Sequence, residues 1–258
     1  MTTSFSEELR KSLDLPHAFG MKCMFHNSSN GRKTFPVVQF LPPEPPATFA
    51  KSRKREFLLG RACAAEALFK LGGPVEQALF KVSDDRLPIW PKDWIGSISH
   101  SPVGAIAIVG KSSFTPVLGI DMHWMRDLPA DLSAFRLVAK RSEYAFVDRL
   151  SPTERHVLIF SAKEALYKAL FPVIRDVLDF SAARVSAFSL GTITLKLRHN
   201  WNHIFQKIAN SLSVGVCVEI TSSLYVVIIS REKLKCQFLY KYSNSLARPQ
   251  CHCSSSHY

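Results

Sequence analysis

Acidic side chains are scarce in this 258-residue chain, in which 21 Asp and Glu stand against 33 Lys and Arg. The formal net charge is therefore +12 and the pI is near 9.6. This balance favours an acidic partner, such as nucleic acid, an anionic membrane, a phosphorylated small molecule or an acidic protein, without choosing among them. Hydrophobic residues at 47% and charged residues at 21% exclude a disordered chain and indicate one or two globular domains.

The sequence also lacks a cysteine framework. Its six cysteines form no CxxC pair, which argues against a zinc knuckle. Cys251, His252 and Cys253 carry side chains that bind metals, but they lie in a Ser-rich terminal segment with no hydrophobic scaffold to fix their geometry. We therefore expect residues 241–258 to form a flexible tail and not a metal site.

No apolar run has the length of a signal peptide or a membrane span. The first 15 residues carry five charges and no such run, which predicts that the chain is not secreted. The most apolar stretch, 213–230, is interrupted by Glu219 and by Thr221, Ser222 and Ser223, so it predicts a pair of buried strands. We expect no transmembrane segment and a reducing, cytoplasmic location.

Periodicity predicts helices over 53–71, 142–150 and 152–170, the first of them stopped by the Gly-Gly-Pro at 72–74. Strands are expected over 35–41, 103–109, 117–121 and much of 183–238.

The order of these elements predicts an α+β fold built of two α/β halves. We assign residues 1–116 to the N-terminal half and 117–240 to the C-terminal half. The repeat is one of architecture, because the two halves show no strong sequence repeat.

The helix that contains 160–168 (FSAKEALYK) carries the first candidate chemistry. Glu164 and Lys168 are four residues apart and share one helical face, where an ordinary surface ion pair is the favoured interpretation of this segment alone. Asp121 supplies a second carboxylate at the expected end of an apolar strand. Carboxylates from two separate elements suit Mg²⁺, and Lys163 and Lys168 would neutralise phosphate charge beside it.

The N-terminal half adds cationic groups, namely Arg53, Arg61, Arg86 and a histidine, His100, in an expected Ser-His-Ser turn. Together with the two carboxylates they predict a polyphosphate bound through Mg²⁺ between the halves. Each group also has an ordinary explanation when taken alone: Asp121 as a turn cap, Arg61 as a solvated helix residue and His100 as a core-edge histidine.

Five segments in this order carry a family resemblance: 53–67 (RKREFLLGRACAAEA), 86–91 (RLPIWP), 96–101 (GSISHS), 119–121 (GID) and 160–168 (FSAKEALYK). The chain resembles the 4′-phosphopantetheinyl transferases of the surfactin type, most closely the enterobactin synthase component D branch. The resemblance covers residues 50–170, and the last segment together with GID is highly specific.

The resemblance implies a pseudo-twofold α/β fold with coenzyme A in the cleft between the halves. It implies Mg²⁺-dependent transfer of 4′-phosphopantetheine to a serine of an apo carrier protein, in siderophore (enterobactin-like) nonribosomal peptide synthesis. By position, Asp121 and Glu164 correspond to the metal carboxylates, and Glu164 and Lys168 to the catalytic residues. The residues implied to bind coenzyme A are Arg53, Arg61, Arg86, Ser99, His100, Lys163 and Lys168.

One position departs from the family pattern. Many members carry a second acid two residues after the Asp of GID, where this chain has His123. A neutral imidazole is a poor Mg²⁺ ligand beside hard oxygen donors. His123 is thus a metal candidate only by its position, and we expect water or a carbonyl to fill the place and Mn²⁺ to be better tolerated.

Positive charge fits an acidic carrier domain (peptidyl, aryl or acyl), which presents an acidic helix beside its serine. The segment 135–150 is the candidate docking surface, since it combines Phe135, Leu137 and Phe146 with Arg136, Lys140 and Arg141. Its alternative is an ordinary amphipathic segment that packs on the core. A monomer is expected, because two internal halves form the whole cleft.

Three other functions remain to be weighed. A serine hydrolase at Ser99 and His100 lacks the glycine two residues after the nucleophile, where Ser101 stands. A nucleic-acid module would explain the charge, but the sequence has no aromatic-basic platform or helix-turn-helix pattern. A non-catalytic relative that binds coenzyme A or nucleic acid stays open because of His123.

Overall fold

The structure is a computed structural model, and it describes residues 7, 17–25, 27–29, 32–34, 39–40, 42, 44–78, 87–102, 104–124, 137–189, 192–197, 215–221 and 224–230. Three predictions fall outside these residues: the contact made by Arg86, the aromatic and basic pair at 135–136, and the tail 241–258. Of the expected strand 35–41, only Gln39 and Phe40 are described, and neither is in a strand.

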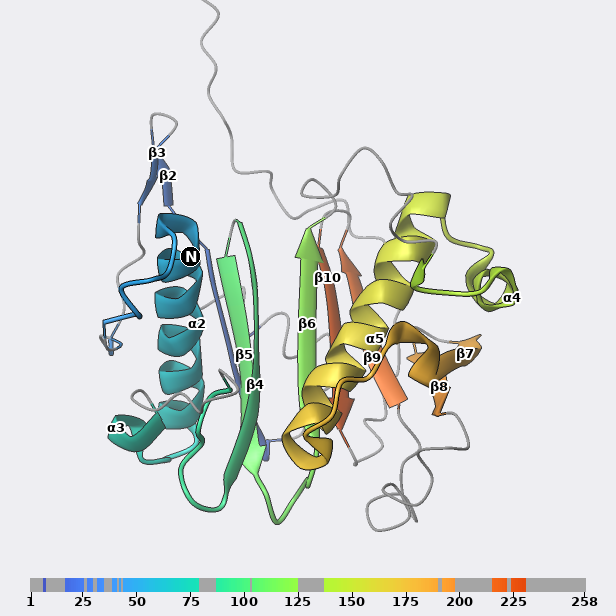
Figure 1. The fold of residues 1–258 in the computed structure, drawn as a ribbon. Coiled ribbons are helices and arrows are strands. Elements are labelled where there is room, and N and C mark those ends of the chain that lie inside the picture. The colour runs from blue at the N-terminus through green and yellow to red at the C-terminus, as the bar shows by residue number, and fades with distance from the viewer. Residues whose placement is uncertain are drawn as a thin grey trace, which may run out of the picture.

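The N-terminal part is a three-stranded antiparallel sheet in the order β1-β5-β4. Its strands are β1 (Phe19–Phe25), β4 (Trp94–Ser101) and β5 (Gly104–Lys111). The helix α2 (Lys51–Lys70) covers this sheet, and α3 (Val75–Ala78) follows it (Figure 1). A small hairpin of β2 (Asn27–Ser29) and β3 (Arg32–Thr34) stands apart.

The C-terminal part is a five-stranded antiparallel sheet in the order β6-β10-β9-β8-β7. Its strands are β6 (Leu118–Trp124), β7 (Ala183–Ser189), β8 (Thr192–Leu197), β9 (Gly215–Thr221) and β10 (Leu224–Ser230). The helix α5 (Pro152–Ile174) crosses this sheet (Figure 1). Before α5 come the short helix α4 (Arg141–Tyr144) and a 3₁₀ turn at Ala145–Val147, and another 3₁₀ turn, Phe180–Ala182, precedes β7.

Small side chains let α2 lie close to its sheet. Its buried face includes Leu59, Ala62 and Cys63, which pack with Ala105 and Ala107 of β5. The helix ends where Gly72 takes a left-handed conformation with φ of 70°. This packing fixes the N-terminal half of α2 above β4, where two of its charged residues meet that strand.

The start of α5 is defined by a capping box. The Ser151 side chain accepts a hydrogen bond from the Glu154 N–H, the Glu154 carboxylate accepts one from the Ser151 N–H, and Pro152 occupies the first turn. The buried side chains of α5, among them Leu158, Ala162 and Leu166, then form the core of the C-terminal half with β7 and β8. The helix is therefore fixed at its start and along one face.

Serine side chains join the two sheets at a seam between β4 and β6. The Ile120 N–H of β6 donates to Ser97 Oγ of β4 at 3.0 Å, and the Met122 N–H donates to Ser99 Oγ at 3.2 Å. Because alternate residues of a strand share one side, both hydroxyls point from β4 toward β6. The seam places the middle of β6 between β4 and α5.

The prediction of mixed helix and strand is confirmed, and the two long helices lie within a few residues of their predicted bounds. The expected helix 142–150 is only the short α4 and its 3₁₀ turn. Two local expectations were wrong: His100 lies in strand β4 and not in a turn, and Asp121 lies in the middle of β6 and not at its end. The pseudo-twofold relation and the domain bounds stay predictions.

No helix in the described part of the chain is both long enough and apolar enough to cross a membrane.

A substitution at Gly119 would test how closely α5 packs against β6. A Cβ at this position would lie 2.0 Å from the Ala165 carbonyl oxygen and 2.9 Å from Ala169 Cβ. Since backbone atoms cannot move aside singly, we expect Gly119→Ala to lower the free energy of unfolding by about 1–3 kcal/mol, measured by urea denaturation.

Gly60→Ala in α2 is the control for that measurement. Its Cβ would meet a single Ile98 methyl at 2.7 Å, and alanine favours a helix over glycine by about 1 kcal/mol. We expect a smaller loss than for Gly119→Ala. Equal losses in the two variants would contradict the tight β6–α5 contact.

Candidate active site

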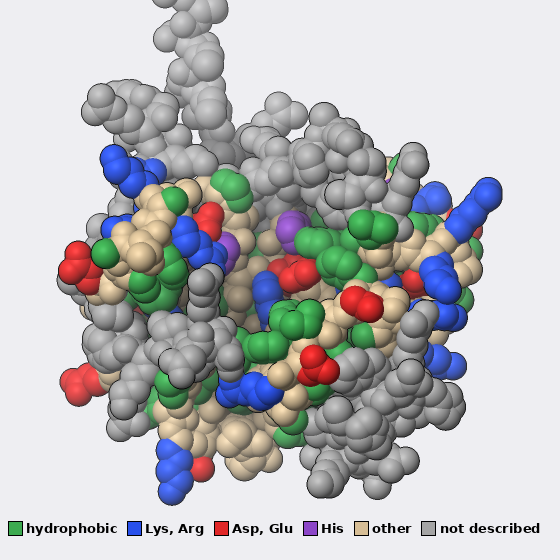
Figure 2. Space-filling view, in the orientation of Figure 1, with side chains coloured by type: hydrophobic (Ala, Val, Ile, Leu, Met, Phe, Trp, Pro, Cys, Tyr) green, Lys and Arg blue, Asp and Glu red, His purple; other side chains and the backbone are tan. Residues whose placement is uncertain are grey.

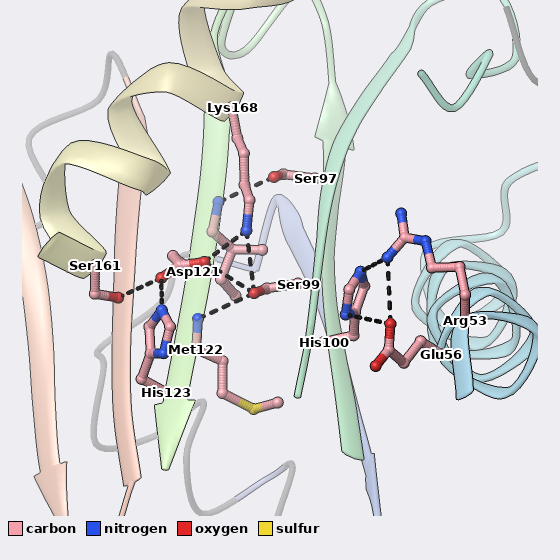
Figure 3. Close-up of polar contacts among 11 residues, drawn as sticks. Arg53, Glu56, Ser97, Ser99, His100, Asp121, Met122, His123, Ser161 and Lys168 are labelled. Atoms are coloured by element: carbon pink, nitrogen blue, oxygen red, sulfur yellow. Dashed lines mark hydrogen bonds and ion pairs between the residues drawn. The ribbon is translucent and has the colours of Figure 1, made fainter. Parts of the chain in front are cut away.

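Asp121 is the centre of the site, and its side chain is only 4% exposed. Four side chains surround its carboxylate (Figure 3). Ser99 Oγ donates to Oδ1 at 3.0 Å and Lys168 Nζ donates to the same oxygen at 2.5 Å. Ser161 Oγ donates to Oδ2 at 2.8 Å, and His123 Nε2 lies 3.0 Å from Oδ2. These partners come from β4, β6 and α5.

The charge of Lys168 decides the ionisation of Asp121. Burial by itself raises the pKa of a carboxyl group, but Lys168 and His123 outweigh that effect, so the pKa of Asp121 lies well below its ordinary value. Asp121 is therefore an anion at neutral pH although it is buried. A buried anion of this kind needs all its donors in place.

Ser99 connects the sheet seam to the charged centre. Its hydroxyl donates to Asp121 and accepts from both the Met122 N–H and Lys168 Nζ, the last at 3.1 Å. One donor and two acceptor positions are the full capacity of a hydroxyl group. Ser99 is thus fully used in holding β4, β6 and α5 together.

Glu164 lies one turn before Lys168 on α5 and is half-buried. Burial raises the pKa of its carboxyl group, and the negative charge of Asp121 raises it further, against the opposite effects of Lys168 and His123. Among the described residues it makes no hydrogen bond or ion pair. The charge of Asp121 thus acts on Glu164, and a shared role of the two carboxylates stays a prediction.

His123 stands against Asp121 on one side and against an aromatic ring on the other. Its ring meets Phe160 edge to face, with 5.0 Å between centroids and 67° between planes. In the part of the chain that the structure describes, no three His, Cys, Asp or Glu side chains form a group that could hold a metal ion. A metal held here would therefore need further oxygen ligands from water or substrate.

A second polar cluster joins α2 to β4. Arg53 Nη1 lies 2.5 Å from His100 Nε2 and 3.3 Å from Glu56 Oε2, while His100 Nδ1 lies 3.4 Å from the same Glu56 oxygen. Figure 3 shows His100 on the side of β4 that faces α2, whereas Ser97 and Ser99 lie on the side that faces β6. Neighbouring residues of β4 therefore serve two different clusters.

The two clusters are close enough to influence each other. The pKa of His100 is lowered, first by burial and then by the charges of Arg53 and Lys168, while Glu56 and Asp121 act in the opposite direction. Figure 2 shows the molecular face hollowed between the α2 and α5 sides, with histidine, lysine and acidic side chains bordering the hollow. The structure thus brings Arg53, His100 and Lys168 to one region.

One predicted residue, Lys163, is used elsewhere. Lys163 Nζ is buried and lies 2.8 Å from Glu143 Oε1, and it donates to the carbonyls of Val138 and Phe180 at 2.7 and 3.0 Å. This ammonium anchors the segment before α5 and the turn after it, so we leave it out of the proposed coenzyme A contacts. Among the described residues, the guanidinium of Arg61 contacts the ring of Phe57.

The Arg61 guanidinium lies 5.3 Å from the centroid of the Phe57 ring, and burial lowers its pKa to about 10. It remains protonated at neutral pH. A buried cation that has no carboxylate partner among the described residues suits an anionic ligand, but the role of Arg61 stays a prediction.

The expected docking segment, 135–150, contains both exposed and buried residues. Leu137 and Phe146 are 85% and 44% exposed, and Lys140 and Arg141 are also exposed. Val138 and Val147, in contrast, belong to the core cluster around α5. Part of this segment therefore packs on the core and part is exposed, and its role in docking stays a prediction.

Sequence reasoning missed Glu56, the seam hydroxyl Ser97 and the α5 hydroxyl Ser161. Ser161 lies three residues before Glu164, so its helical spacing placed it on the same face of the helix as Glu164. Glu56 lies three residues after Arg53 on the same basis. No sequence signal links Glu56 to His100 on β4, or Ser161 to Asp121 on β6.

The site therefore combines a buried carboxylate paired with a lysine, a second carboxylate and an Arg-His pair. Two family models match the chain. The 4′-phosphopantetheinyl transferase N-terminal domain matches residues 46–110, and the 4′-phosphopantetheinyl transferase superfamily matches residues 117–217. The chain belongs to the 4′-phosphopantetheinyl transferase superfamily.

The names of individual relatives agree with this family assignment. The chain is 35% identical to 4′-phosphopantetheinyl transferase PptT of Mycobacterium tuberculosis, over 58% of this chain and 66% of the relative. It is 33% identical to 4′-phosphopantetheinyl transferase Svp of Streptomyces mobaraensis, over 62% and 67%. It is 30% identical to enterobactin synthase component D of Salmonella typhi, over 57% and 60%. The matched part thus spans about two thirds of each relative or less, and the narrower branch assignment stays a prediction.

Lys168→Met tests the charge pairing at Asp121. In the wild type, the folded pKa of Asp121 lies below its unfolded value of about 4, so its stabilising contribution is present above pH 4 and is lost as the pH falls further. Without the ammonium, burial raises the folded pKa instead. We expect a loss of about 3 kcal/mol at pH 7 that shrinks toward pH 4.

Urea denaturation at pH 7 and pH 4, with a chelator present, measures this difference. Lys92→Met, at an exposed position, is the control and should change stability little at either pH. A loss in Lys168→Met that is the same at both pH values would contradict the pairing.

Proposed function

We propose that this protein transfers 4′-phosphopantetheine from coenzyme A to a serine hydroxyl of an apo carrier protein. The observation that carries the proposal is the group formed by Asp121, Glu164 and Lys168. Two carboxylates and an ammonium from β6 and α5 lie together, and the Arg53–His100 pair of the other half is close enough for the charges of Lys168 and Asp121 to act on His100. That arrangement suits a ligand with several phosphates that spans the seam.

Coenzyme A would bind with its charged groups distributed over both clusters. Arg53 and His100 suit the terminal 3′-phosphate of the nucleotide, since the Arg53 side chain is 49% exposed and that of His100 33%. Lys168, at 28% exposure, suits the pyrophosphate. Ser99 is fixed between them, and Arg61 and Arg86 are further contacts implied by the resemblance alone.

The residues of the site fit a divalent cation such as Mg²⁺, with Mn²⁺ as an alternative. Burial raises the pKa of Glu164 and the charge of Asp121 raises it further, and a cation near the two carboxylates would relieve both effects. Asp121 and Glu164 would hold it, while His123 donates to Asp121. A bound cation supplies neutralisation of pyrophosphate charge.

The chemistry of the chain's own residues follows from their placement. The carrier serine oxygen forms a bond to the β-phosphorus of coenzyme A while the bond to the 3′,5′-bisphosphate leaving group breaks. Glu164 accepts the serine proton, and its raised pKa suits this task because the carboxylate holds a proton better. Lys168 stabilises the negative charge that develops on the leaving phosphate.

The carrier would dock on the exposed part of the segment before α5. Lys140, Arg141 and Arg149 are exposed there beside Leu137 and Phe146, and cationic side chains gather at the edge of the molecule that carries α4 (Figure 2). Such a surface complements the acidic helix of a carrier domain. We place the protein in the cytoplasm as a monomer, serving siderophore synthesis, on the resemblance and on the sequence expectations above.

Glu164→Gln tests the proposed base. Apo carrier protein, coenzyme A and Mg²⁺ are incubated with the enzyme, and mass spectrometry follows the gain of one phosphopantetheine per carrier. We expect the variant to lose at least about a hundredfold in rate, because an amide cannot accept the proton. Its affinity for coenzyme A, measured by calorimetry, should change far less.

Glu76→Gln, at an exposed position of α3, is the matched control and should transfer at the wild-type rate. Equal rates for Glu164→Gln and the wild type would remove Glu164 from the mechanism. A wild-type protein that binds coenzyme A but never modifies peptidyl, aryl or acyl carriers would instead show a non-catalytic relative.

Charge reversal tests the docking surface. We expect the double variant Arg141→Glu, Arg149→Glu to raise KM for the carrier by about tenfold, equivalent to about 1.4 kcal/mol, because like charges then face each other. KM for coenzyme A should stay unchanged. Lys92→Glu, exposed in the turn before β4, is the control, and an equal effect in both proteins would contradict a specific surface.

A further inference from the structure

Glu56 is a charged residue to which the proposed transfer gives no task. It lies on α2, its side chain is 21% exposed, and one of its oxygens, Oε2, faces both Arg53 and His100 (Figure 3). The three groups form a closed triangle of 2.5, 3.3 and 3.4 Å contacts. Its geometry determines which atoms of the imidazole carry protons.

The Arg53 contact determines the tautomer of His100. A guanidinium only donates hydrogen bonds, so the imidazole Nε2 that it approaches must be an acceptor without a proton. The ring proton then lies on Nδ1, where it faces the Glu56 carboxylate. Without ligand, His100 is thus neutral, in agreement with its lowered pKa.

A phosphate changes this arrangement. A dianionic terminal phosphate that binds Arg53 takes over its donors and comes to face His100 Nε2. The lone pair of Nε2 would repel the phosphate oxygens, so His100 must present a proton there. It can do so by moving its single proton from Nδ1 to Nε2, or by taking up a second one.

Glu56 excludes the first of these routes. If Nδ1 lost its proton, its lone pair would face a carboxylate that has no proton to donate. The imidazolium, in contrast, donates to Glu56 at Nδ1 and to phosphate at Nε2. We propose that Glu56 is a positioning residue that makes the Arg53–His100 pair bind a terminal phosphate with uptake of one proton from solvent.

The other charged groups around His100 agree with this direction. Arg53 on α2 and Lys168 on α5 oppose a charged imidazole, while Glu56 on α2 and Asp121 on β6 favour it. A bound phosphate removes much of the opposition, because it neutralises Arg53. The balance then shifts toward the imidazolium.

The inference rests on the proposed function, since coenzyme A supplies the terminal phosphate, but calorimetry tests it without any transfer. Binding heats are measured at pH 7.5 in buffers of different ionisation enthalpy, with coenzyme A and with dephospho-coenzyme A, which lacks the 3′-phosphate. We expect an uptake approaching one proton for coenzyme A and none for dephospho-coenzyme A. The Kd for coenzyme A should rise toward about tenfold for each pH unit above neutrality.

Glu56→Gln is the decisive variant. A glutamine amide can donate to Nδ1, which permits the neutral tautomer with its proton on Nε2. The variant should still bind coenzyme A, but without proton uptake and with a Kd that changes less than about twofold for each pH unit. Glu76→Gln is the control and should behave as the wild type.

Three outcomes would overturn the inference while leaving the proposed function in place. One is binding of coenzyme A to the wild type without proton uptake, and another is uptake that persists in Glu56→Gln. A third is equal uptake with dephospho-coenzyme A, which would place the proton elsewhere. A protein that binds neither ligand overturns the proposed function and this inference with it.

Discussion

A carboxylate held as an anion away from water is the constraint on which the structure depends. Burial opposes the charge of Asp121, and only donors from β4, β6 and α5 together compensate for it. None of these elements can shift without leaving a buried charge unpaired, which is strongly unfavourable. The same interaction therefore fixes the seam between the sheets and brings Lys168 beside Glu164.

Because side chains alternate along β4, neighbouring residues of this strand contribute to two different clusters. Ser97 and Ser99 face β6 and hold the charged centre, whereas His100 faces α2 and meets Arg53 (Figure 3). One strand thus supplies both sides of the proposed binding region. A shift of register by one residue would exchange these sides and destroy both clusters.

Local sequence patterns predict the helical pair Glu164 and Lys168, because i,i+4 spacing is a local property. They could not distinguish Lys163 from Lys168, since the partner of Lys163 is Glu143, about twenty positions upstream and on a different element. The strand position of His100 was hidden for a similar reason. Small polar residues at 99–101 resemble a turn, and only pairing with β5 and the seam makes them a strand.

The replacement of an acid by His123 follows the same electrostatic logic. Asp121 and Glu164 contribute two negative charges and Lys168 one positive charge, and an acid at position 123 would add a further negative charge that a histidine does not. A less negative site attracts a cation less strongly, but it also opposes the ionisation of Glu164 less. His123 in addition gives Asp121 a donor within 3.0 Å, where an acid would give it a repulsive neighbour. A histidine at position 123 thus compensates the buried carboxylate of Asp121 better than an acid would, and its effect on cation binding stays a prediction.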